Sequence, residues 1–126
     1  MDNRFFVAIC CEALKIKKPV QIKFKTKGTG EFKSCAGLYI TRYRKNSILR
    51  HDITINLDSV IHAEYNLNGV IAHELIHACQ EEHNLWKENG KHHNKKFQDI
   101  AKVLETCLAE YGFETGPIYS PLTDTE

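Results

Sequence analysis

The chain has 126 residues, of which 42% are hydrophobic and 26% charged, and its formal net charge is +1. This length predicts one compact domain with a single core, and the composition excludes fibrous and low-complexity classes. No apolar run approaches the ~20 residues of a membrane-spanning helix, so we expect no membrane partner.

The five cysteines indicate a reducing environment. Their number is odd and no two form a C-x-x-C pair, which argues against a disulfide framework and against a four-cysteine zinc ribbon. The apolar stretch 5–11 is followed by Lys15, Lys17 and Lys18 rather than by a small-residue cleavage site. We therefore expect a helix instead of a secretory signal, and an intracellular protein of the cytoplasm or nucleus.

The first half of the chain predicts one helix and three strands. Residues 3–17 have apolar side chains at helical spacing, and Lys18-Pro19 should end that helix. Residues 20–27 alternate apolar and polar, as a half-buried strand does, and Gly28-Thr29-Gly30 reads as a turn. Residues 36–44 and 51–57 predict two more strands, the last with Ile53, Ile55 and Leu57 on one face. We expect a small antiparallel three-stranded sheet.

The second half predicts two helices. Residues 66–69 offer N-cap residues for a helix that runs to about His83. After a turn at Asn89-Gly90, residues 94–111 carry apolar side chains at helical spacing, and Gly112 is placed as a left-handed cap. The fold class is therefore α+β, with one domain over residues 1–119 and a flexible tail over 120–126.

The first of these two helices contains His73-Glu74-Leu75-Ile76-His77. Histidines four residues apart share one helix face, so both imidazoles can reach one metal ion. In an H-E-x-x-H arrangement the glutamate acts as the general base of a metallopeptidase. The neighbouring residues of the helix are apolar, and polar groups in such surroundings are costly unless something satisfies them. The pattern predicts His73 and His77 as zinc ligands and Glu74 as the catalytic base.

A catalytic zinc needs a third protein ligand, and the residues alone leave several candidates. His83 has the metzincin spacing, but Gln80 stands where that motif has glycine and the only methionine is Met1. Glu105 on the last predicted helix is a second candidate. His92 and His93 lie just before that helix and are a third.

Two motifs carry a resemblance to a known family. The stretch 70–78, which contains His73, Glu74 and His77, precedes His93-Asn94-Lys95-Lys96-Phe97. Together they resemble the SprT-like family of zinc metallopeptidases, which pairs H-E-x-x-H-A with a downstream H-G-x-x-F. The resemblance implies a zincin-like fold, one zinc ion per chain, His93 as third ligand and Phe97 as a core residue.

The chain departs from the family pattern in two respects. Asn94 replaces the usual glycine, and there are no cysteines for the C-terminal zinc ribbon that many relatives carry. The resemblance therefore covers the catalytic domain only. Because His92 lies beside His93, the third ligand could be either of these two residues.

The expected reaction is hydrolysis of a peptide bond in a protein substrate. Peptide hydrolysis also needs a donor that stabilises the oxyanion. Four residues could supply it, and the sequence does not choose among them: Tyr39, Tyr43, Tyr119 and His92.

Charge is distributed unevenly along the chain. Residues 1–60 hold twelve Lys or Arg against five acids, whereas the remainder holds five against eleven. Basic residues on the strands could contact nucleic acid, although a solvated sheet face explains them equally well. The candidates are Lys23, Lys25, Lys27, Arg42, Arg44 and Lys45.

Three functions follow from the motif and the charge. The first is an endopeptidase, expected to be monomeric, for proteins bound or crosslinked to DNA, since the SprT-like family acts on such substrates. The second is a zinc-stabilised nucleic-acid-binding module without peptidase activity. The third is a peptidase for one dedicated regulatory protein.

Overall fold

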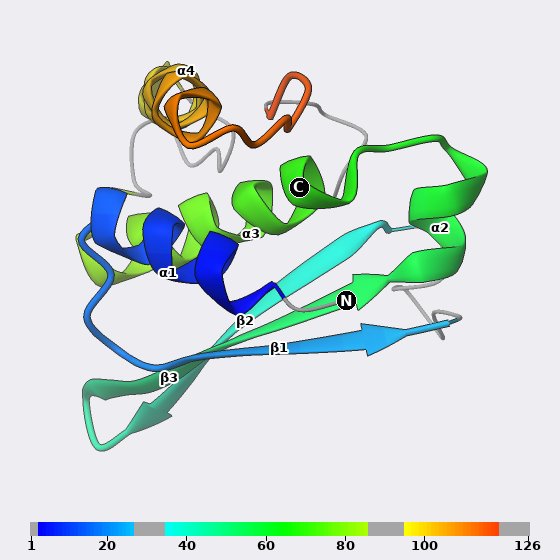
Figure 1. Ribbon diagram of the computed structural model, residues 1–126. Helices are drawn as coiled ribbons and strands as arrows, with labels where there is room; N and C mark the ends of the chain where they lie inside the picture. Colours follow the sequence, from blue (N-terminus) through cyan, green and yellow to red (C-terminus); the bar gives the residue numbers. More distant parts are fainter. Residues whose placement is uncertain (1–2, 27–34, 86–94, 119–126) are drawn as a thin grey trace.

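The computed structural model describes residues 3–26, 35–85 and 95–118 (Figure 1). Within these residues one helix precedes three strands and three helices follow them, and the predicted α+β class is confirmed. In chain order the elements are α1 (Arg4–Ala13), β1 (Val20–Lys25), β2 (Gly37–Arg44), β3 (Ser47–Asn56), α2 (Leu57–His62), α3 (Leu67–Glu82) and α4 (Lys95–Glu110).

The sheet is mixed, so the expectation of a purely antiparallel sheet was wrong. The strand order is β1-β3-β2, with β1 parallel to β3 and β2 antiparallel to it. The expectation assumed that strands adjacent in sequence pair with each other, which is common but not general. Here β3 is the central strand, and its inner face is more buried than those of β1 and β2. Ile53 and Ile55 are both 0% exposed.

The boundaries of β3 also differ from the prediction. A tight turn at Lys45, whose φ is 51°, joins β2 directly to β3, so β3 begins at Ser47 rather than at residue 51. At its other end Asn56 is the N-cap residue of α2, and its side-chain amide donates a hydrogen bond to the Ser59 hydroxyl over 2.9 Å. Leu57 therefore opens a short helix that the sequence pattern did not predict.

Helices α1, α3 and α4 form two layers on one side of the sheet (Figure 1). Figure 1 shows α1 and α3 against one face of the sheet, with α4 on the far side of α3. As a result α3 is enclosed, and all of its residues from Gly69 to Gln80 are buried. Its N-cap matches the prediction, because the Asn66 side chain accepts a hydrogen bond from the Gly69 amide.

The chain turns sharply after α4. Gly112 has φ of +85°, a left-handed conformation that glycine adopts without strain, as predicted. The backbone then continues to Ile118, which is 1% exposed. Residues 119–126 lie outside the described part of the chain, so the boundary between domain and tail at 119/120 stays a prediction. Within the described ranges, no helix has the length and apolarity needed to cross a membrane.

Candidate metal centre

His73, Glu74 and His77 lie in the middle of α3, in the most enclosed part of the fold. Their exposed fractions are 0%, 0% and 3%. The helix keeps them there because its other residues are apolar on every side: Val70, Ile71, Ala72, Leu75, Ile76 and Ala78 are all buried. Burying two imidazoles and a carboxylate is costly unless a partner compensates them.

The two imidazoles face the same direction and share a neighbour. Their ring centroids lie 4.9 Å apart, as expected one helical turn from each other. The Phe97 ring of α4 packs against both, with centroid distances of 4.8 Å to His73 and 5.1 Å to His77. Phe97 is 0% exposed, which agrees with the core position that the resemblance implied. Both rings are therefore held in place by packing.

Each imidazole has an oxygen at Nδ1. The Ile118 carbonyl lies 3.2 Å from Nδ1 of His73, and the Gln80 side-chain oxygen lies 2.8 Å from Nδ1 of His77. An oxygen acceptor requires that Nδ1 carry the proton, which leaves the lone pair of a neutral ring on Nε2. Metal-binding histidines characteristically show this arrangement, because the outer hydrogen bond fixes the tautomer and the ring orientation.

The Glu74 carboxylate lies against the first residue of β2. A Cβ built on Gly37 would be 2.7 Å from Oε2 of Glu74 and 2.9 Å from its Cδ. Any side chain at position 37 would therefore push the carboxylate away. The absence of a Cβ creates the space that Glu74 occupies.

A divalent metal fits this donor set. Two imidazoles one helical turn apart, each with an oxygen at Nδ1 and both beside a buried carboxylate, are the kind of donor set that zinc selects. Within residues 3–26, 35–85 and 95–118, no group of three or more His, Cys, Asp or Glu side chains is placed to hold a metal ion. His92 and His93 lie outside the described residues, so the choice of third ligand stays a prediction.

The other candidates for third ligand have different contacts. His83 is the C-cap residue of α3, and its Nε2 lies 2.9 Å from the Lys15 carbonyl, so it bonds the segment after α1. The Glu105 carboxylate accepts a hydrogen bond from the Ile118 amide. The structure thus gives both residues a role in joining segments of the fold.

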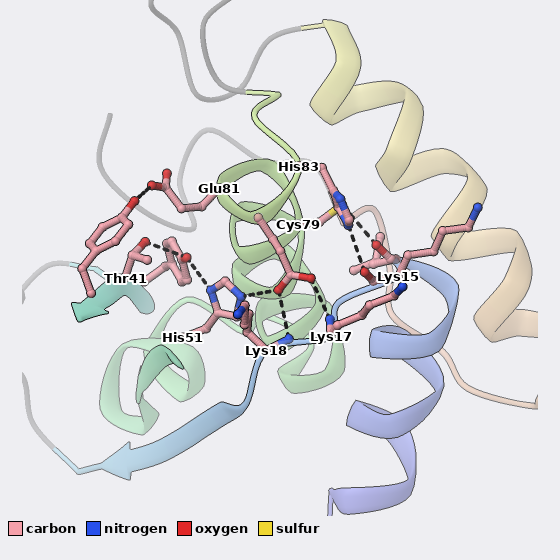
Figure 2. A network of polar contacts seen from close by, with 12 residues as sticks. Lys15, Lys17, Lys18, Thr41, His51, Cys79, Glu81 and His83 are labelled. Carbon is pink, nitrogen blue, oxygen red and sulfur yellow. Dashed lines mark hydrogen bonds and ion pairs between the residues drawn. The ribbon is translucent and has the colours of Figure 1, made fainter. Parts of the chain in front are cut away.

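A second polar network closes the C-terminal end of α3 (Figure 2). His51 of β3 is 0% exposed; its Nδ1 lies 2.7 Å from the Tyr39 hydroxyl, and its Nε2 lies 2.9 Å from Oε1 of Glu82. Thr41 donates in turn to the Tyr39 hydroxyl. Glu82 also accepts hydrogen bonds from the backbone amides of Lys17 and Lys18. The network ties α3 to two strands and to the segment after α1.

This network also affects the pKa values of its members. Burial raises the pKa of the Tyr39 hydroxyl well above its usual range. Burial also opposes ionisation of Glu82, but the hydrogen bonds from His51, Lys17 and Lys18 outweigh it and hold the pKa of that carboxyl below its usual value.

Two of the four candidate oxyanion donors, Tyr39 and Tyr43, are hydrogen-bonded near this network. The Tyr39 hydroxyl is engaged with His51, and the Tyr43 hydroxyl donates to Glu81. Both hydroxyls are therefore bonded at the C-terminal end of α3 rather than beside Glu74. The remaining two candidates, Tyr119 and His92, lie outside the described residues.

The basic residues of the strands are only partly brought together. Lys23, Lys25 and Arg42 line a hollow of about 370 Å³ on the open face of the sheet. Asp52 lies in the same hollow and forms ion pairs with Arg42 at 2.9 Å and with Arg50 at 2.7 Å. Hydrogen bonds from Arg50 and Arg42 outweigh the opposing effect of burial and hold the pKa of Asp52 below its usual value. Arg44 and Lys45 are exposed at the β2–β3 turn, and Lys27 lies outside the described residues.

Sequence reasoning missed three residues of the site: Gly37, Gln80 and Ile118. Gln80 could have been found, because a position three residues after His77 shares its helix face. Gly37 and Ile118 reach the site only through tertiary packing, and no local pattern marks them.

Comparison with known proteins identifies one family. The family model described as SprT-like matches residues 4–116, which include the whole of α3 and α4. Neither the curated proteins nor the solved structures contain a match to this chain.

Proposed function

Since the chain belongs to the SprT-like family, we propose that it is a zinc-dependent endopeptidase. The observation that carries the proposal is the buried group on α3, in which His73 and His77 each have an oxygen at Nδ1 and Glu74 lies beside them. His93 is the third ligand in this proposal, on the strength of the family motif. A merely structural role for the two histidines would not require a carboxylate between them.

The roles of the residues follow from their chemistry. Zinc, when bound, polarises a carbonyl and lowers the pKa of water toward ~7. His73 and His77 offer Nε2 to the metal. The Glu74 carboxylate accepts a proton from the attacking water and returns it to the leaving amine. The absence of a side chain at Gly37 leaves room for the carboxylate. The apolar residues of α3 around the site exclude bulk water, which strengthens the electrostatic interactions inside.

The test compares Glu74→Gln with the wild type. We expect the variant to retain stoichiometric zinc and to lose cleavage of an unstructured protein substrate, since the amide cannot accept the proton. Glu110→Gln, a matched change at an exposed position of α4, should behave as the wild type. Stoichiometric zinc in a wild-type protein that cleaves no substrate, with or without single-stranded or duplex DNA, would contradict the proposal.

We further propose that the substrates are proteins bound to DNA and that the hollow on the open sheet face contacts the phosphates. Support comes from Lys23 and Lys25, which line the hollow from one strand and, among the described residues, form no ion pair like that of Arg42. Among the described helices, none covers this face, so a nucleic acid has access to it.

Double charge reversal, Lys23→Glu with Lys25→Glu, tests the proposed DNA surface. We expect weaker DNA binding and a smaller slope of log K against log salt, by about 0.7–0.9 for each phosphate that the protein no longer neutralises. Lys102→Glu, an exposed position on α4, is the control. Unchanged affinity for DNA in the double variant would contradict the proposed DNA contact and would favour a peptidase for one regulatory protein.

The hollow also supports a second function, a zinc-stabilised nucleic-acid-binding module without peptidase activity. The same two variants separate the functions. A binding module would tolerate Glu74→Gln and lose its function on reversal of Lys23 and Lys25, whereas the peptidase fails with Glu74→Gln under every condition.

A further inference from the structure

The segment after α4 crosses the face of α3 that bears His73. We call residues 113–118 the C-terminal strap. The strap begins with Phe113, whose amide bonds the Leu108 carbonyl and whose ring meets Phe6 of α1 edge-on at a centroid distance of 5.1 Å. The beginning of the strap is therefore fixed to both α4 and α1.

The strap then passes very close to the N-terminus of α3. A Cβ on Gly69 would lie only 2.3 Å from the Thr115 carbonyl oxygen. Thr115 is 6% exposed, and its hydroxyl donates to the Gly116 carbonyl at 2.8 Å. Gly116 has φ of +62°, which lets the backbone turn toward Ile118. Only glycine at position 69 permits this approach.

The end of the strap joins two elements through one residue. The Ile118 amide donates to Oε1 of Glu105 on α4 at 2.5 Å, and the Ile118 carbonyl accepts from Nδ1 of His73 on α3. Ile118 itself is 1% exposed, so water does not compete for these groups. The position of the acceptor that orients His73 thus depends on a carboxylate of another helix.

We propose that Glu105 is a positioning residue for the metal centre, which acts on His73 through the backbone of Ile118. The inference rests on the proposed zinc site. Glu105 is not a ligand here; it holds the carbonyl that fixes the tautomer and the orientation of one ligand. His77 obtains the same support locally, from Gln80 one turn along its own helix.

The proposal is tested by the affinity for zinc, measured by competition with a chromophoric chelator. Loss of an outer hydrogen-bond partner typically lowers metal affinity 10–100-fold, and we expect a loss in this range for Glu105→Ala. Glu105→Gln keeps an oxygen acceptor for the Ile118 amide and should restore affinity to near the wild-type value. Glu110→Ala, on the exposed side of the same helix, is the control and should change nothing.

A double-mutant cycle distinguishes positioning from a general loss of structure. In a His73→Ala background, Glu105→Ala should leave the residual zinc affinity unchanged, because its effect passes through His73. Gly69→Ala disturbs the strap from the other side, at Thr115, and should also weaken zinc binding. Where Glu105→Ala does not fold, Glu105→Asp takes its place in both comparisons, because its shorter side chain withdraws the carboxylate from the Ile118 amide.

Three results would overturn the proposal: unchanged affinity in Glu105→Ala, equal losses in Glu105→Ala and Glu105→Gln, or an equal loss with and without His73. These outcomes differ from a failure of the proposed function. A wild-type protein that binds no zinc would remove the metal centre itself, whereas a zinc-loaded wild type that cleaves protein and tolerates Glu105→Ala would remove only the role of Glu105.

Discussion

Two regions along α3 place histidine beside glutamate, but the contacts of the imidazole rings differ. Near its C-terminus, Glu82 pairs with His51, and both ring nitrogens of that histidine meet protein groups, Tyr39 on one side and Glu82 on the other. In the middle of the helix, the protein presents oxygens to Nδ1 of His73 and of His77. Burial of histidine and glutamate is therefore not in itself a sign of a metal site. The informative difference lies at Nδ1, which faces a hydroxyl in the case of His51, a carbonyl oxygen in the case of His73 and a side-chain amide oxygen in the case of His77.

The largest effect is expected from His77→Ala. Removal of a ligand should lower zinc affinity by more than the ~100-fold that an outer-partner mutation can cause. By contrast His51→Ala should leave zinc affinity unchanged. Titration of both variants against a chelator checks the contrast, and equal affinities in the two would show that the two regions do not differ as proposed.

Gly37→Ala should reduce cleavage on the order of 100-fold, since a displacement of a catalytic group by about 1 Å can cost that much. The added methyl would overlap the Glu74 carboxylate, which must move. Zinc affinity should stay close to the wild-type value, because Glu74 is not a ligand in the proposed mechanism. Steady-state kinetics with parallel metal analysis provides the measurement. Wild-type turnover would show that the carboxylate tolerates displacement.

His51→Ala should lower the free energy of unfolding by about 2–3 kcal/mol. The variant leaves a cavity at a fully buried position and removes a partner of both Tyr39 and Glu82. Urea unfolding of the metal-free proteins isolates this effect from zinc binding. An unchanged midpoint would mean that the network at the C-terminal end of α3 contributes little to stability.

The smallest effect concerns the pH dependence that Glu82 confers. Its pKa is lower in the folded protein than the 4.5 of an unperturbed carboxyl. Its contribution is therefore complete above that value and is lost as the pH falls through the folded-state pKa. Glu82→Gln should be less stable than the wild type at pH 7, and the gap should narrow at an acidic pH below 4.5. A gap that is the same at both pH values would assign the effect to packing instead of charge.

Local signals in the sequence were enough to predict α3 and the shared face of His73 and His77. Asn66 provides the cap, and the spacing of His73 and His77 follows from helical periodicity alone. Gly112 was likewise predictable, because a left-handed cap needs glycine. These features depend on a few consecutive residues.

Features that depend on distant parts of the chain were not predictable in this way. In the parallel pairing, β1 lies next to β3 instead of its sequence neighbour β2, and no alternation of side chains reveals that. Gly37 and Ile118 meet α3 only after the sheet and α4 have packed. Tyr39 was interpreted as a possible oxyanion donor because its chemistry permits it, but the pairing of β2 with β3 places its hydroxyl at His51.

The hydrogen bond between His73 and Ile118 joins residues 45 positions apart in sequence, and this separation bears on how the protein matures. As the chain leaves the ribosome, the H-E-x-x-H segment emerges before the α4 residues and the backbone that will orient its first histidine. Translation adds about 5–20 residues each second, so the nascent helix spends seconds without that support. For the zinc site proposed above, the ligand set would acquire its final geometry only when α4 has docked, which would make high-affinity capture of the metal a late event in folding.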